Sequence, residues 1–174
     1  MPKRLLMLVP GAALLVACSS PTGPDSSLTA GYMLTIVPGS ECPAWPETPT
    51  ALWKIPVTVV SENRTIQATS AEQTQFAPTV FLRLYEGGAP MTGELGGGYR
   101  PGTAGWLLTV GSWPEMIGGI YGPTDGRVPV RAEGSLGTSI RGTWNGFVSV
   151  QLPGGRWISC GWPTHQFVLE RSSR

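Results

Sequence analysis

The chain has 174 residues, with 12 Lys and Arg against 11 Asp and Glu, so its formal net charge is +1. Charged residues make up only 13%, which leaves no basic face and argues against a nucleic-acid partner. Glycine (24) and proline (17) are abundant, yet seven tryptophans and alternating aliphatic residues provide apolar area to bury, which argues against disorder. Short strands joined by Gly/Pro turns fit this composition, so we expect an all-β fold.

The first residues form a basic start followed by an apolar run. Lys3 and Arg4 precede residues 5–16, and the run ends in Leu15-Val16-Ala17-Cys18. A positive start, a short apolar segment and a small residue before the cut are typical of a secretory signal peptide. As a helix the run would be about 18 Å long, short of the roughly 30 Å hydrocarbon core. A transmembrane helix is therefore disfavoured.

The stretch ending at Cys18 resembles the lipobox of bacterial lipoproteins. The resemblance implies cleavage before Cys18, diacylation of its thiol and acylation of the new amino group. We then expect residues 1–17 to be a cleaved signal peptide, 18–29 a lipidated flexible tether rich in Ser, Pro and Gly, and 30–174 a β-barrel-like domain. The alternative is a plain secretory peptide with an incidental cysteine.

The resemblance also implies a location and a membrane partner. Ser19 and Ser20 follow the anchor, and in Gram-negative lipoproteins a non-acidic residue there goes with transfer to the outer membrane. We therefore expect a domain anchored to the outer membrane through the Cys18 lipid and facing the periplasm.

Strand-like alternation recurs along the rest of the chain. It predicts strands at 32–37, 53–60, 65–69, 79–85, 106–110 and 127–133, with a weaker one at 91–95. Residues 115–121 are either a short strand or a loop, and the glycine run 96–98 is interpreted as a flexible loop.

Residues 139–152 allow two interpretations. Asn145-Gly146 is a strong two-residue hairpin signal. Alternate positions from Ile140 to Leu152, however, keep one parity through that dipeptide, which favours one long strand that bends at its glycines. A turn at 153–155, a return at 156–159 and a last strand at 165–171 should follow.

Cys42 and Cys160 are the remaining thiols if Cys18 is acylated. In an oxidising compartment such a pair is expected to form a disulfide; two separate buried thiols are the alternative. Cys42 follows the first predicted strand and Cys160 precedes the last, so the bond would link those strands. Since first and last strands pair when an up-and-down sheet closes, we expect a single antiparallel up-and-down barrel of about eight strands. A two-sheet β-sandwich is the alternative.

Residues 134–146, Cys160 with 164–169, and 32–35 with Cys42 resemble uncharacterised bacterial secreted lipoproteins with a lipocalin-like barrel. The resemblance covers the two ends of the domain, and its motifs are structural. It therefore implies a fold and no catalytic residue.

Candidate catalytic groups are sparse. His165 is the only histidine and has no partner suggested by spacing, so a structural role is favoured. Glu86, Glu94 and Glu115 could meet at a barrel mouth, but scattered acids produce such coincidences easily. No G-x-S-x-G, H-E-x-x-H or P-loop occurs, and two cysteines with one histidine make a poor zinc site. We expect no enzymatic activity, metal or cofactor.

Tryptophans are the most prominent functional candidates. Trp45, Trp113 and Trp162 lie beside proline or glycine in predicted loops. They could cover the ends of the barrel, line a pocket for an apolar ligand, or contact a protein. The first function we expect is non-catalytic binding of a small apolar ligand, with these three tryptophans at the site; the second is protein interaction or a structural role in the envelope.

Overall fold

The computed structural model describes residues 31–42, 45, 48–71, 79–102, 105–111, 116–117, 120–121 and 126–172. Cys18, with the predicted signal peptide and tether, lies outside these ranges. The described chain is almost entirely strand: β1 (Gly31–Val37), β2 (Lys54–Glu62), β3 (Thr65–Ser70), β4 (Phe81–Tyr85), β5 (Met91–Tyr99), β6 (Leu107–Gly111), β7 (Met116–Ile117), β8 (Ile120–Tyr121), β9 (Val128–Gly134), β10 (Ser139–Gln151) and β11 (Trp157–Arg171). A four-residue helix, α1 (Thr50–Trp53), precedes β2.

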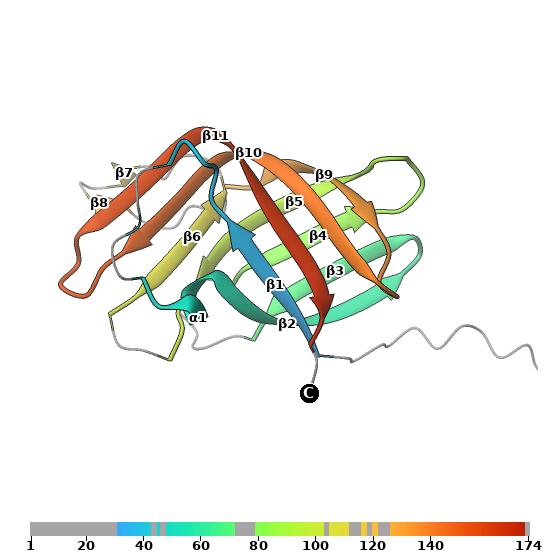
Figure 1. The fold of residues 1–174 in the computed structure, drawn as a ribbon, viewed down its shortest axis with the longest axis horizontal. Coiled ribbons are helices and arrows are strands. Elements are labelled where there is room, and N and C mark those ends of the chain that lie inside the picture. Colours follow the sequence, from blue (N-terminus) through green and yellow to red (C-terminus); the bar gives the residue numbers. More distant parts are fainter. Residues whose placement is uncertain are drawn as a thin grey trace, which may run out of the picture.

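The strands close into an antiparallel barrel (Figure 1). Neighbouring strands pair in sequence from β1 to β5, β10 pairs with β11, and β11 pairs back with β1 with Leu34 opposite Leu169. The predicted up-and-down barrel of eight strands is therefore confirmed, and two further short strands, β7 and β8, form a separate pair. Closure removes the open sheet edges that would otherwise be free to pair with another chain.

One barrel strand is made of two pieces. β6 and β9 both lie between β5 and β10 and run antiparallel to both neighbours. β6 pairs with the second half of each neighbour and β9 with the first half, so the two pieces follow one another along the same position in the wall. Between them in the chain lie β7 and β8, which pair with each other. The end of β6 and the start of the segment before β9 are in contact, since a Cβ on Gly111 would overlap the Gly126 carbonyl oxygen.

Alternation sends apolar side chains into the barrel and polar ones outward. In β2, for example, buried Ile55, Val57 and Val59 alternate with exposed neighbours. The following interior residues retain at most 2% of their accessible surface: Leu34, Ile55, Val59, Ile66, Leu82, Leu84, Leu95, Leu108, Val148, Val150, Phe167 and Leu169. Because a cavity that admits water would leave its lining side chains accessible, the interior around these residues is filled.

Three phenylalanines stand directly opposite glycines on neighbouring strands. Phe81 faces Gly96, Phe147 faces Gly161 and Phe167 faces Gly142. A Cβ on Gly96 would lie 3.2 Å from the Phe81 ring, and a Cβ on Gly142 or Gly161 would overlap the facing ring. The rings thus occupy the space that a side chain would need, an arrangement that makes glycine tolerable within a strand.

Several strand boundaries in the structure differ from the predicted ones. The single long strand is confirmed as β10, whereas residues 96–98 belong to β5 and are not a loop. Within β5 the alternation shifts between Leu95 and Gly96, and the next residue, Gly97, has a φ of 99° that suits glycine. Trp53 ends α1 and is not part of a strand.

The predicted return 156–159 and last strand 165–171 are one strand, β11. The pairing of β11 with β10 shifts between Asn145–Thr164 and Phe147–Gly161, so β11 holds one extra residue there. Cys160 consequently lies within a strand and not before one.

Candidate functional site

The two ends of the barrel are built differently. At one end, called the hairpin end, short connections join β2 to β3, β4 to β5 and β9 to β10. The first and last described residues also meet there, since the Ser172 N–H donates to the Gly31 carbonyl at 3.0 Å. At the opposite end lie the connections 38–53, 71–80, 100–106 and 152–156. These are longer on average, and two of them bring aromatic side chains that the structure describes.

Four aromatic residues define this second end, called here the aromatic end: Trp45, Trp53, Tyr99 and Trp106. All four are partly buried and pack against the barrel core. Trp45 and Trp53 meet edge to face, with ring centroids 5.4 Å apart and an interplanar angle of 63°. The Trp53 indole N–H donates to Thr48 Oγ1 at 3.0 Å, whereas the buried Trp45 Nε1 has no hydrogen-bond partner. One indole N–H of the pair therefore has a hydrogen-bond partner and the other does not, and both rings are partly exposed.

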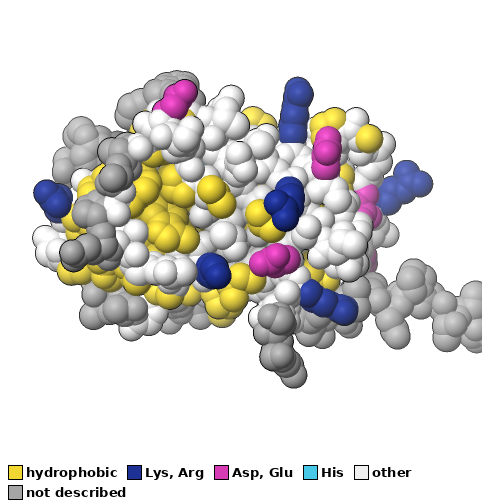
Figure 2. Space-filling model, in the orientation of Figure 1, with side chains coloured by type: hydrophobic (Ala, Val, Ile, Leu, Met, Phe, Trp, Pro, Cys, Tyr) yellow, Lys and Arg dark blue, Asp and Glu magenta, His cyan; other side chains and the backbone are white. Residues whose placement is uncertain are grey.

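Tyr99 and Trp106 flank the connection between β5 and β6. The helix α1, which ends at Trp53, contacts β6, so these side chains come from segments that adjoin one another. Figure 2 shows hydrophobic side chains gathered at this end of the molecule, on the left of the view. Burial raises the pKa of the Tyr99 phenol, which therefore stays protonated and able to donate a hydrogen bond.

The structure places one of the three predicted tryptophans at this site. Trp45 lies at the aromatic end, Trp113 is outside the described residues, and Trp162 belongs to β11 but its side chain is not among those described. Trp53, Tyr99 and Trp106 were not predicted as site residues. Their signal is positional: Trp53 and Trp106 each directly precede a strand that starts at this end, and Tyr99 ends one that finishes there.

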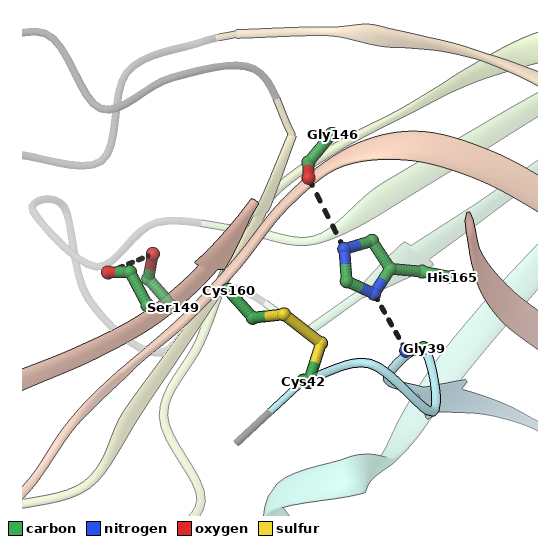
Figure 3. The surroundings of a disulfide bond; sticks show 7 residues. Gly39, Cys42, Gly146, Ser149, Cys160 and His165 are labelled. Carbon is green, nitrogen blue, oxygen red and sulfur yellow. Dashed lines mark hydrogen bonds between the residues drawn. A yellow bond between two sulfur atoms is a disulfide. The ribbon is translucent and has the colours of Figure 1, made fainter. Parts of the chain in front are cut away.

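The predicted disulfide is confirmed. Cys42 and Cys160 are bonded, with Cα atoms 5.5 Å apart across a sequence separation of 118 (Figure 3). It ties the start of the connection 38–53, which brings Trp45 and Trp53, to the barrel wall. In the chain-entropy model, a bond closing so long a loop is worth about 4–5 kcal/mol.

His165 lies beside the disulfide and is completely buried. Its Nδ1 accepts a hydrogen bond from the Gly39 N–H at 3.0 Å, which leaves Nε2 to donate to the Gly146 carbonyl at 3.2 Å (Figure 3). Its ring also packs on Trp144, with centroids 5.1 Å apart. Burial lowers the pKa of the imidazole, partly opposed by the bond to Gly146. Both ring nitrogens are thus occupied by backbone groups, which is typical of a structural histidine.

The acidic candidates do not come together. Glu94 lies on β5 and forms an ion pair with Arg127 at 3.3 Å, Glu86 follows β4 at the hairpin end, and Glu115 is outside the described residues. Within the ranges the structure describes, no group of three or more His, Cys, Asp or Glu residues could hold a metal ion. None of the described helices is long and apolar enough to cross a membrane.

Comparison of the chain with protein-family models, curated protein sequences and solved structures finds no match. Function is therefore inferred from the barrel itself.

Proposed function

We propose that this chain is a membrane-anchored envelope lipoprotein whose rigid barrel presents the aromatic end to a protein partner. The observation that favours this function is the contrast between a filled interior and a partly exposed group of aromatic residues. Tryptophan and tyrosine are the residues most often found at the energetic centre of protein interfaces.

The interior argues against the other candidate, binding of a small apolar ligand inside the barrel. Such a site usually needs a cavity of roughly 300 Å³ or more lined by apolar side chains. Here the interior side chains from β1 to β11 pack on one another with almost no accessible surface. A ligand would have to displace core residues at a cost of several kcal/mol. The packed interior therefore favours a function at the surface of the barrel over ligand binding inside it.

Charge at the aromatic end fits a protein better than a membrane surface. Its exposed charged residues are Glu41, Lys54, Arg100 and Arg156, and the three basic ones come from different segments of the chain. Anionic lipid would select a denser cluster of about four to eight lysines and arginines. A protein surface accepts alternating charges around an apolar centre.

The anchor would orient this end away from the bilayer. The described chain begins at Gly31, at the hairpin end, so a lipid on Cys18 would hold that end toward the membrane. A flexible tether of twelve residues has an average span of about 20 Å. The aromatic end would then be open to a partner in the periplasm.

In-cell photo-crosslinking tests the proposal. A photoreactive amino acid would replace Trp106 at the aromatic end of the full-length chain. The matched control would replace Tyr85, a 43% exposed aromatic residue at the hairpin end. We expect a discrete adduct of protein size from position 106 and none from position 85. Equal labelling at both positions, or no adduct at position 106, would overturn the proposal.

A further inference from the structure

His165 joins the loop of the aromatic end to the barrel wall. The ring stands on β11 and bonds in opposite directions to Gly39, which lies just after β1, and to Gly146 on β10 (Figure 3). Gly39 is the second residue of the connection that brings Trp45 and Trp53, and its carbonyl accepts from the Cys42 N–H at 3.0 Å. The turn between Gly39 and Cys42 is therefore held by one histidine and one disulfide.

Only one protonation state of the ring satisfies both contacts. Nδ1 must be unprotonated to accept from the Gly39 N–H, and Nε2 must bear the proton that it donates to Gly146. A second proton would sit on Nδ1 and point at the Gly39 N–H, so two donors would face each other. Protonation of His165 is thus incompatible with the Gly39 contact.

We propose that His165 is an acid-sensitive latch that fixes the turn 38–42 in neutral conditions and releases it on acidification. The Cys42–Cys160 disulfide limits how far this turn can move, so the release is local and reversible. The consequence for binding rests on the proposed function: the partner-facing tryptophans are held in position only while the latch is closed.

The surroundings of the ring support a release and not a stabilised cation. Charged residues on the elements that pack around it are exposed and do not share its buried site; they are Glu41 in the turn after β1, Arg141 on β10, and Glu170 and Arg171 on β11. The ring stacks beside Trp144, whose Nε1 is itself buried without a partner. No described carboxylate therefore compensates an imidazolium there.

The turn after β1 has less regular structure around it than the strands that it contacts. In the described part of 38–53, regular structure is limited to the four-residue helix α1, whereas β10 and β11 are paired along almost their whole length. Opening of the turn 38–42 breaks the contact between Gly39 and His165 and leaves the strand pairings intact, so it costs less than separating the strands.

The direction of the pH effect follows from linkage. Burial lowers the pKa of His165 below the value of about 6.5 expected for a released imidazole. The latch is fully effective above that value and weakens as the pH falls toward the lower pKa of the closed state. Between the two pKa values, each unit of acidification raises the opening equilibrium by up to about tenfold.

Amide hydrogen exchange of the full-length chain tests the latch. Rates at about pH 7.5 and about pH 5, corrected for the intrinsic pH dependence of exchange, would be compared for residues 38–42 and for β3. We expect opening of 38–42 to rise at least severalfold at the lower pH while β3 remains unchanged. Equal opening of 38–42 at both pH values, or simultaneous loss of protection in β3, would overturn the proposal.

The matched variant is H165Q. Its amide can accept from the Gly39 N–H and donate to the Gly146 carbonyl, but it does not titrate in this range. We expect the pH dependence of opening to disappear in H165Q, and an unchanged pH dependence would contradict the proposal.

If H165Q does not fold, NMR of the native chain provides the test, because His165 is its only histidine. The ring and the Gly39 amide should titrate with one midpoint below about 6.5. Separate midpoints would contradict the proposal. None of these readouts needs a partner, so they are independent of the crosslinking result.

Discussion

The hairpin end and the aromatic end belong to one barrel but are stabilised by different means. At the hairpin end, the chain turns within a few residues, and local geometry suffices to position it. Asn63 and Arg64 make the shortest turn, both with positive φ (50° and 60°). At the aromatic end the connections are longer, and one of them depends on a disulfide and a buried histidine. Extra constraints therefore appear where a connection is long and carries aromatic side chains that pack against the barrel core.

Removing the disulfide should have the largest effect and should act at the aromatic end. C42S/C160S loses a cross-link that is worth about 4–5 kcal/mol in the chain-entropy model. Chemical denaturation under oxidising conditions would measure the loss of unfolding free energy. Exchange protection should fall first in residues 38–53, with the β2–β3 turn little affected. A loss of protection that is uniform over both ends would contradict the comparison.

A substitution in the barrel wall between the two ends should cause the second-largest loss of stability. G142A would place a Cβ against the Phe167 ring and 2.7 Å from the Arg131 carbonyl oxygen. Overpacking of this kind costs about 1–3 kcal/mol. G102A is the matched control, since nothing lies within 4 Å of a Cβ at that exposed position. Thermal unfolding should separate the two variants; equal melting temperatures would show that the ring does not depend on the glycine.

The closure of the hairpin end can be weakened through Tyr32. Its hydroxyl donates to the Leu136 carbonyl at 3.2 Å, joining β1 to the β9–β10 connection. Y32F should therefore cost about 0.5–1.5 kcal/mol, the usual net value of one hydrogen bond. Equilibrium denaturation should detect this change, and the crosslinking pattern at the aromatic end should stay as in the native chain. Altered crosslinking would mean that the two ends are coupled.

The smallest expected effect is a gain in the free energy of unfolding. R64G replaces a residue with φ of 60° in the β2–β3 turn by glycine, which adopts this conformation without strain and completes the preferred Asn-Gly turn sequence. The unfolding free energy should rise by about 0.5–1 kcal/mol, less the entropy that glycine adds to the unfolded chain. Denaturant titration would measure it. A clear loss would indicate that the Arg64 side chain makes a contact that the turn needs.

Alternation along single strands predicted much of this fold. It identified β10 as one strand through Asn145-Gly146, and the positions of Cys42 and Cys160 predicted both barrel closure and the disulfide. Alternation could not show that β6 and β9 share one position in the barrel wall, because that position depends on pairing with β5 and β10 and not on local sequence. The glycine run in β5 was misread for a similar reason, since the ring that covers Gly96 comes from β4.

The candidate site was only partly predictable. Proline and glycine neighbours drew attention to Trp45, Trp113 and Trp162, but a local sequence does not reveal at which end of a barrel a loop lies. Strand direction does reveal it, and this groups Trp53, Tyr99 and Trp106 with Trp45. His165 showed no partner by spacing because both of its partners are backbone groups of distant glycines.

The central claim is that the barrel is a packed scaffold and not a container. The most direct test is to compare the native and denatured masses of the full-length protein purified from membranes. We predict the same covalent mass in both states, two protons lighter than the reduced chain because of the disulfide, with no small molecule released on denaturation. A stoichiometric small molecule that is present in the native state and released on unfolding would contradict the account and restore ligand binding as the function.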